Sequence, residues 1–181
     1  MKSAFEEEHD TMENDQAVLE KLQEMGIELI PIELPEWPVY SLSFILNAEA
    51  AAAFDQLTLS GRDDLLVRQI KNAWPNVFRH SRFISAVEYV NANRVRYLWI
   101  QKMNEIMKKV DVYVAPSFGK NLLLTNLTGH PCVVLPNGFS EEGAPTSISF
   151  SGKLFEEGKV LAVAKRYQDA TDFHLKHPDL E

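Results

Sequence analysis

The chain has 181 residues, 45% of them hydrophobic, and carries a formal net charge of −8 at pH 7. This composition excludes a disordered segment, and the acidic balance argues against a nucleic-acid-binding module, which needs clustered Lys and Arg to hold phosphates. No apolar run reaches the length of a membrane span and residues 1–10 contain no apolar signal core, so a soluble chain without membrane contact is expected. The single cysteine, Cys132, cannot form an internal disulfide, which favours a reducing compartment such as the cytoplasm.

The first helix is predicted over about residues 13–25, where Val18, Leu22 and Met25 recur at helical spacing before a glycine. The apolar run 27–34, closed by a proline, predicts a strand, and a helix followed by a strand is typical of an α/β unit. No strand-like run precedes this helix in the sequence. The acidic side chains around its start are interpreted as a solvated face, and they are Glu6, Glu7, Glu8, Asp10, Glu13 and Asp15.

The middle of the chain is predicted to be mostly helical. The expected elements, in order, are a helix over 47–54, a loop over 61–64, a mixed stretch over 68–81 with Pro75 as a breaker, and a long helix over about 82–109. Val95, Trp99 and Met103 form part of an apolar stripe along the long helix, and such a stripe demands a large partner surface.

The last seventy residues contain short strands and a set of turn motifs. Strands are expected over 111–116, 133–136 and 147–150, with turns at Gly138, Gly143 and Pro145, and a final helix over about 155–174. The motifs, in chain order, are DVYVAP (111–116), TNLTGHP (125–131), VVLPNG (133–138) and GAP (143–145).

In this order the motifs resemble the C-terminal pattern of the amidase signature family, and residues 82–96 resemble the long helix of that family. The resemblance covers nearly the whole chain. It implies an α/β fold with a mixed β-sheet flanked by helices. It also implies that residues 1–181 form a single incomplete domain, cut at the front and intact at the back.

The motif residues are interpreted as structural rather than catalytic. Asn126 is expected in a polar loop between strands, and Gly129 allows a positive φ before Pro131. Pro136 and Gly138 are expected to end a strand and turn the chain.

The resemblance places the catalytic chemistry outside this chain. Members of the family use a serine nucleophile, a second serine in a cis peptide and a lysine base, which lie in their larger N-terminal part. The nearest Ser-Gly pairs here are Ser60-Gly61 and Ser151-Gly152, and both are interpreted as ordinary turns. We therefore expect no catalytic residue and no cofactor in this chain. The parent enzyme is expected to hydrolyse a small-molecule carboxamide, with the chain alone inactive.

The loop 117–122 contains no Asp or Glu, whereas glutamine-recognising members of the family tend to have an acidic residue there. This difference favours a general amidase over a glutaminase. Loops of this region can line the substrate pocket in the full enzymes, so Lys120 and Asn121 are the candidate substrate-binding residues.

The residue types also allow two other kinds of site, a thiol–imidazole pair and a metal site. Cys132 and His130, two apart, could form a thiol–imidazole pair, but a buried small hydrophobe is the simpler interpretation of Cys132. Asp172, His174 and His177 could hold a metal, but favourable charge at a helix C-terminus is the simpler interpretation, so no metal site is expected.

A second hypothesis treats the chain as a stand-alone, non-catalytic binding or oligomerisation module that kept the fold. Removal of the rest of an amidase would expose strand edges and the apolar face of the long helix, and such surfaces usually become interfaces. Under both hypotheses the chain is expected to form a homo-oligomer that buries about 1,000 Å² or more.

Overall fold

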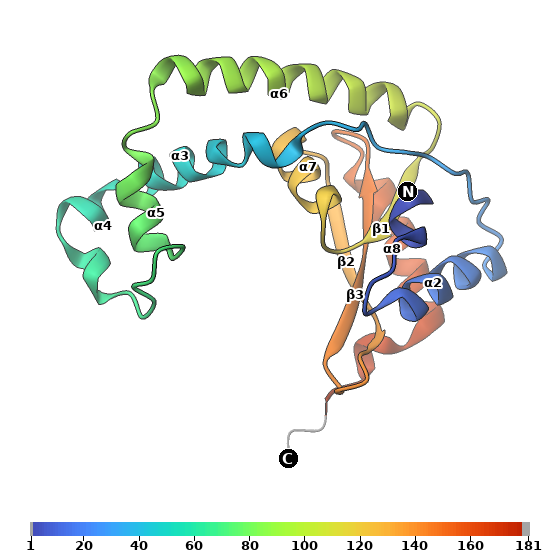
Figure 1. The fold of residues 1–181 in the computed structure, drawn as a ribbon. Helices are drawn as coiled ribbons and strands as arrows, with labels where there is room; N and C mark the ends of the chain where they lie inside the picture. Colours follow the sequence, from blue (N-terminus) through green and yellow to red (C-terminus); the bar gives the residue numbers. More distant parts are fainter. Residues whose placement is uncertain (1, 179–181) are drawn as a thin grey trace. The chain divides into compact units, whose positions relative to one another are not determined.

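The computed structural model describes residues 2–178, and the chain divides into two compact units (Figure 1). Unit 1 comprises Met1–Glu36 and Ile100–Glu181, and unit 2 comprises Trp37–Trp99. The expectation of a single incomplete domain stays a prediction, because one domain of a larger enzyme can contain two compact units.

Among the described residues, unit 1 consists of a small sheet, four α-helices, the end of a fifth α-helix and one 3-10 helix. Its elements are α1 (Lys2–Glu6), α2 (Met12–Glu24), the last residues of α6 (Ala86–Met107), β1 (Val112–Pro116), α7 (Lys120–Thr128), β2 (Cys132–Phe139), β3 (Pro145–Gly152), α8 (Glu157–Thr171) and the 3-10 helix η3 (Phe173–Leu175). The strands confirm the three expected ones, with β2 and β3 longer than expected.

Within residues 2–178 the strands form one antiparallel sheet in the order β1-β3-β2. The expected mixed sheet is therefore not found in this part of the chain, where the short connections suit antiparallel neighbours. Val114 and Phe150 are register partners on one face of the sheet, and Tyr113 and Ser151 are partners on the other.

The two faces of the sheet are covered by different helices. Side chains from α2 and α8 join Val114, Ile148 and Phe150 in one apolar core, in which Phe150 packs 5.4 Å from Tyr167 between ring centroids. On the opposite face, the Tyr113 hydroxyl reaches a side chain of α7. Unit 1 is therefore a three-layer arrangement, and its core lies between the sheet and the pair α2 and α8.

The segment after α2 corrects a prediction. α2 confirms the first predicted helix and ends before Gly26, which has a φ of 76°. The predicted strand 27–34 is wrong, because no strand is assigned over these residues. Two backbone hydrogen bonds hold the segment, from Ile27 N–H to Leu22 O at 3.0 Å and from Lys2 N–H to Ile32 O at 3.0 Å. A strand needs a hydrogen-bonded ladder with a neighbour, and the described residues supply none there.

Unit 2 is helical. Its elements are the 3-10 helix η1 (Val39–Leu42), α3 (Phe44–Ala53), α4 (Asp55–Leu59), the 3-10 helix η2 (Arg62–Leu65), α5 (Trp74–Ser81) and the first part of α6. Pro75 is the second residue of α5 and does not break the helix, since proline lacks only an N–H that is unpaired in the first turn anyway. Aromatic rings fill the space between helices, with Phe78 stacked on Phe54 at 5.3 Å and on Trp74 at 5.5 Å between centroids.

The long helix α6 confirms the prediction of one long helix, with slightly shorter bounds than 82–109. In its last turns Met103 and Met107 are completely buried. None of the described helices is both long and apolar enough to cross a membrane.

Substituting Gly152 with alanine is expected to lower the free energy of unfolding by about 1–3 kcal/mol, because a β-carbon there overpacks the core. That carbon would lie 2.2 Å from Cγ2 of Val160, which is 1% exposed on α8. Gly158→Ala is the matched control, since a β-carbon at Gly158 meets nothing within 4 Å and alanine favours a helix. Urea unfolding of both variants checks the prediction, and equal stability of the two would contradict it.

Candidate functional site

Helix α7 replaces the predicted polar loop around Asn126. Gly119, with a φ of 100°, precedes the helix, and Gly129, with a φ of 77°, follows it. The N–H groups of Gly129 and His130 both donate to Thr125 O, at 2.8 and 3.2 Å, which closes the helix. Asn126 is exposed on α7, so its predicted place in a loop is wrong. The leucines at 122–124 and 127, followed by a glycine, are the signal that would have predicted this helix.

The structure separates the two predicted substrate-binding residues. Lys120 is exposed at the first position of α7, whereas Asn121 is only 2% exposed. The Tyr113 hydroxyl donates to Asn121 Oδ1 at 2.6 Å, and burial raises the pKa of Tyr113 well above its usual range. The Asn121 side chain therefore ties α7 to the sheet. Substrate contact by Lys120 or Asn121 stays a prediction.

The motif residues of β2 lie within the strand and coincide with an irregularity in its pairing. Pro136 and Gly138 were expected to end it, but both lie inside β2, and the register with β3 shifts between them. This bulge turns Asn137 inward, where it is 2% exposed. Gly138 has a φ of 152°, and a β-carbon there would lie 2.8 Å from Asn14 Cγ. Pro131 precedes the strand, and its carbonyl accepts a hydrogen bond from Gly152 N–H at 3.0 Å.

A buried polar network connects α2 to the bulge. Asn137 Nδ2 donates to Asp15 Oδ1 at 2.6 Å, and Thr146 Oγ1 donates to Asn137 Oδ1 at 2.8 Å. Asn14 Nδ2 donates to Thr146 Oγ1 and to Phe139 O, both at 3.0 Å. The network fixes the position of α2 on the β2–β3 hairpin.

Asp15 was interpreted as part of a solvated acidic face, and that interpretation is wrong, because Asp15 is 1% exposed. Its position was readable from the helical period. Asp15 precedes Val18 by three residues and Leu22 by seven, so all three lie on the same buried face of α2.

His9 pairs with the same carboxylate from the loop before α2. His9 Nε2 lies 2.8 Å from Asp15 Oδ2, and His9 Nδ1 lies 2.7 Å from Glu7 O. Both ring nitrogens face oxygen acceptors, an arrangement that suits the protonated imidazolium. The Glu7 carbonyl, the Asp15 carboxylate and the charge of Asp10 raise the pKa of His9 above 6.5.

The raised pKa of His9 predicts a pH-dependent stability of unit 1. A group with a raised folded-state pKa contributes fully below its unfolded pKa of 6.5 and loses that contribution as pH rises through the folded value. Wild type should therefore lose its advantage over His9→Asn as the pH is raised from about 6.5 through the raised folded-state pKa. Urea unfolding of both proteins across this range checks the prediction. A stability difference that is constant or grows with pH would contradict it.

Neither the thiol–imidazole pair nor the metal site that the residue types allowed is formed in the described part of the chain. Cys132 is exposed rather than buried, which corrects its interpretation as a small core residue. The His130 ring is 7% exposed and lies 2.8 Å from Thr128 Oγ1, and burial lowers its pKa. Over residues 2–178 no group of three or more His, Cys, Asp or Glu side chains is placed to hold a metal ion.

The serines in the two Ser-Gly pairs lie in ordinary secondary structure. Ser60 follows α4 and precedes Gly61, which has a φ of 69°. Ser151 is a buried residue of β3, so Ser151-Gly152 is the end of a strand rather than a turn. Between residues 2 and 178 no serine hydroxyl is hydrogen-bonded to a lysine amine or a histidine ring.

Comparisons with known proteins are consistent in what they find, although no family model matches the chain. It is 24% identical to an amidase of Pseudomonas putida over 191 residues, covering 91% of this chain and 40% of the relative. It is 27% identical to a glutamyl-tRNA(Gln) amidotransferase subunit of Bordetella avium over 205 residues, covering 90% and 40%. With the same subunit of Trichormus variabilis the identity is 34% over 112 residues, which cover 51% of this chain and 23% of the relative.

Solved structures show the same fold. An amidase family protein from Bacillus anthracis matches with a TM-score of 0.74 at 18% identity, covering 97% of this chain and 38% of that chain. A bacterial aryl acylamidase of the amidase signature enzymes matches with a TM-score of 0.69 at 15% identity, covering 93% and 41%.

The fold of this chain therefore corresponds to one part of the fold of amidases. The chain belongs to the amidase signature family. It spans about two fifths of the length of the Pseudomonas and Bordetella proteins that it matches.

Proposed function

We propose that this chain is the C-terminal part of an amidase-signature hydrolase, whose parent breaks a carboxamide C–N bond by acyl transfer through a serine. The observation that carries the proposal is the extent of the match, because the amidase of Pseudomonas putida aligns with 91% of this chain but only 40% of its own length. The order of the motifs over 111–145 supports the C-terminal placement, since it resembles the pattern near the end of the family.

The chain alone is proposed to be inactive. Acyl transfer needs an activated nucleophile, a base and preorganised N–H donors for the oxyanion. The buried serines Ser149 and Ser117 are bonded to each other instead, with Ser149 Oγ donating to Ser117 Oγ at 3.2 Å. The role of this chain in the parent is therefore to form part of the framework around the site, with Lys120 exposed at the start of α7.

The parent is proposed to be a general amidase rather than a glutaminase. The loop 117–119 and the first turn of α7 contain no Asp or Glu to recognise the amino group of glutamine. Lys120 is the cation of this segment, and an exposed ammonium group attracts negative charge in a substrate rather than an amine.

The test is an ammonia-release assay on the purified chain, with glutamine and a set of aliphatic and aromatic carboxamides as substrates. The expected rate is that of buffer for every substrate. Hydrolysis that increases in proportion to the amount of chain and is saturated by substrate would contradict the proposed inactivity. Such activity with glutamine alone would also contradict the assignment as a general amidase.

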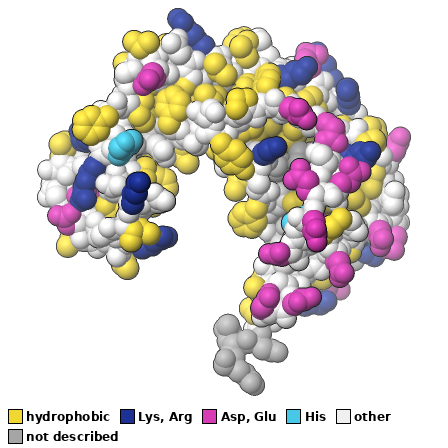
Figure 2. Space-filling model, in the orientation of Figure 1, with side chains coloured by type: hydrophobic (Ala, Val, Ile, Leu, Met, Phe, Trp, Pro, Cys, Tyr) yellow, Lys and Arg dark blue, Asp and Glu magenta, His cyan; other side chains and the backbone are white. Residues whose placement is uncertain are grey.

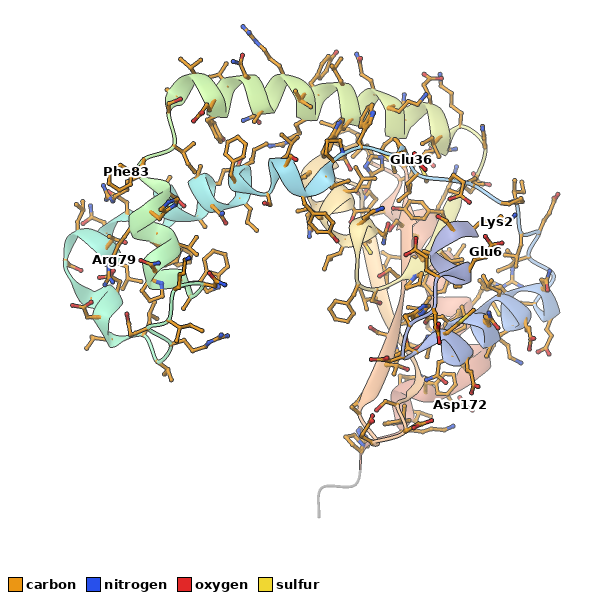
Figure 3. The ribbon with its side chains drawn as sticks, viewed as in Figure 1. Lys2, Glu6, Glu36, Arg79, Phe83 and Asp172 are labelled. Atoms are coloured by element: carbon orange, nitrogen blue, oxygen red, sulfur yellow. The ribbon has the colours of Figure 1, made fainter. Side chains whose placement is uncertain are left out.

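A second candidate function, a non-catalytic oligomerisation module, is favoured by the surface of unit 2. Val67 is 100% exposed, Phe83 85% and Leu65 78%, and Figure 2 shows hydrophobic side chains at the surface. Phe83 follows the end of α5 (Figure 3). Exposed apolar side chains that gather into a patch are typical of an interface.

Self-association is accordingly expected, and sedimentation velocity at increasing concentration measures it. Phe83→Ser and Val67→Ser should shift the chain toward monomer, whereas a wild-type chain that remains monomeric at every concentration would contradict the prediction.

A further inference from the structure

Two stretches of chain line a groove in unit 2. One stretch is the face of α3 that continues into the start of α4, and the other runs from the end of α5 through the turn 82–85 into α6. Phe83, which Figure 3 labels, lies in this turn. The volume of the groove is about 520 Å³, within the range of ligand pockets in proteins. All of the lining residues belong to unit 2, so this unit alone forms the groove.

Small apolar side chains form much of the groove surface. Ala48, Ala51 and Ala52 are spaced by three and four residues, so they share one face of α3. Ile84 and Ala86 add apolar surface from the other stretch. An occupant with an apolar body would remove this surface from water, which contributes about 25 cal/mol for each Å².

The charged side chains of the groove favour a cation. The carboxylates of Glu49 and Asp55 line it against one guanidinium, that of Arg82. Arg82 is paired with Oδ1 of Asp55. Glu49 Oε1 accepts from the Tyr89 hydroxyl at 3.0 Å and lies 3.6 Å from Nη1 of Arg96, which does not line the groove. The other two oxygens, Glu49 Oε2 and Asp55 Oδ2, accept no hydrogen bond from any described residue.

The start of α6 does not offer a site for an anion. Ser85 Oγ accepts from Glu88 N–H at 3.2 Å and donates to Glu88 Oε2 at 3.3 Å, so the chain itself caps the helix. The Glu88 carboxylate also supplies the negative charge that a helix N-terminus attracts. An anionic ligand would in addition be repelled by the two carboxylates that line the groove.

Ser81 is a buried polar residue that the fold leaves without a hydrogen-bond partner. It is the last residue of α5, lines the groove and is 6% exposed. Serines in helices often donate to the carbonyl four residues earlier, but among the described residues the Ser81 hydroxyl has no partner. Buried hydroxyls are nearly always hydrogen-bonded, so this one indicates an occupant of the groove that bonds to it.

We propose that this groove binds a primary ammonium group attached to an apolar body, as in an aralkylamine. An ammonium group has three N–H donors and no acceptor. We assign the three acceptors to Glu49 Oε2, Asp55 Oδ2 and Ser81 Oγ, while the alanines and Ile84 contact the apolar body. The inference goes beyond the proposed function and does not depend on it, because this binding requires no amide hydrolysis.

Isothermal titration calorimetry of the whole chain with phenethylamine near neutral pH tests the proposal. Phenethyl alcohol and hydrocinnamate serve as the neutral and the anionic counterparts of similar size. The amine should bind saturably with one site per chain, and the alcohol should bind about tenfold more weakly or less, because charge-assisted hydrogen bonds are lost. Hydrocinnamate should not bind.

Glu49→Gln removes one carboxylate charge and keeps a side-chain oxygen for the Tyr89 hydroxyl. The Glu49 side chain is 50% exposed, so folding should survive, while amine binding should weaken by about tenfold or more. Glu88→Gln is the matched control, because it removes the same charge from the same unit at an exposed residue that does not line the groove. Its binding should equal that of wild type.

Ser81→Ala distinguishes a hydroxyl that binds a ligand from one that holds the fold. The variant should bind the amine about threefold more weakly or less, while its urea midpoint stays the same or rises, because the lost hydroxyl had no partner in the chain. A lower midpoint with unchanged binding would assign the hydroxyl to the fold and overturn the inference.

The inference is also overturned if phenethylamine does not bind saturably, if hydrocinnamate binds more tightly than the amine, or if Glu49→Gln binds as well as Glu88→Gln. None of these results bears on the proposed function, which fails only if the chain alone releases ammonia from amides.

Discussion

Asp15→Ala is expected to lower the free energy of unfolding of unit 1 by about 3–5 kcal/mol, the usual cost of removing one partner from a buried polar or charged pair. Asp15 Oδ1 accepts from Asn137 at 2.6 Å, and Oδ2 faces His9 at 2.8 Å. Alanine leaves the Asn137 amide without its acceptor at a residue that is 2% exposed. The lost contacts join α2 to β2, so the defect should loosen the helix on the hairpin.

Hydrogen exchange of the sheet amides, combined with urea unfolding, measures this effect. Glu13→Ala is the matched control, since Glu13 is an exposed carboxylate on the same helix and its loss should change stability by less than about 0.5 kcal/mol. Asp15→Asn keeps the shape of the side chain and an oxygen acceptor, so it should cost less than Asp15→Ala. Equal stability of Asp15→Ala and Glu13→Ala would show that the network contributes nothing.

The parts of the fold that sequence reasoning predicted are those decided by local pattern. α2, α6 and α8 have clear helical periodicity, and the strands over 112–116 and 145–152 combine β-branched residues with turn signals. Family resemblance came from the spacing of glycines and prolines, which depends on backbone geometry. Gly129 illustrates this, because its φ of 77° is a conformation that glycine adopts without strain.

The wrong predictions concern residues whose structure depends on a partner that is far away in the sequence. Residues 27–34 have the composition of a strand, yet strand pairing needs a neighbour that the described chain does not provide. Asp15 has a surface residue type at a core position, and Asn137, which lies 122 residues away, is what makes its burial tolerable. Asn121 was expected in a loop, but it lies in α7, where the Tyr113 hydroxyl donates to its side chain. No local pattern in the sequence contains these pairings.

Unit 2 also contains a buried carboxylate, and removing its cationic partner is expected to destabilise this unit strongly. Asp63 is 2% exposed, and its Oδ2 lies 2.7 Å from a guanidinium nitrogen of Arg79. Arg79→Ala leaves this carboxylate buried without its cation. The expected loss is about 2–4 kcal/mol, less than for a fully buried pair because the Arg79 side chain is 43% exposed and water screens it. Figure 3 labels Arg79 on α5.

The tryptophans make this effect separable from that of Asp15. All three, Trp37, Trp74 and Trp99, belong to unit 2, so tryptophan fluorescence during urea unfolding follows unit 2 alone. Arg79→Ala should shift that transition, while Asp15→Ala should shift the exchange of the sheet amides instead. Arg94→Ala is the control, because Arg94 is exposed in the same unit and bonds only to Asn91 among the described side chains.

Arg79 and His9 also predict different dependences of stability on pH in the two units. Arginine keeps its charge throughout the range in which proteins are stable, so the cost of Arg79→Ala should be the same at about pH 6 and about pH 9. The His9 contribution to unit 1 should instead fade as the pH rises through the raised pKa of His9. If fluorescence and sheet exchange respond to pH in parallel, the two units do not unfold independently, and the assignment of each carboxylate to its own unit is contradicted.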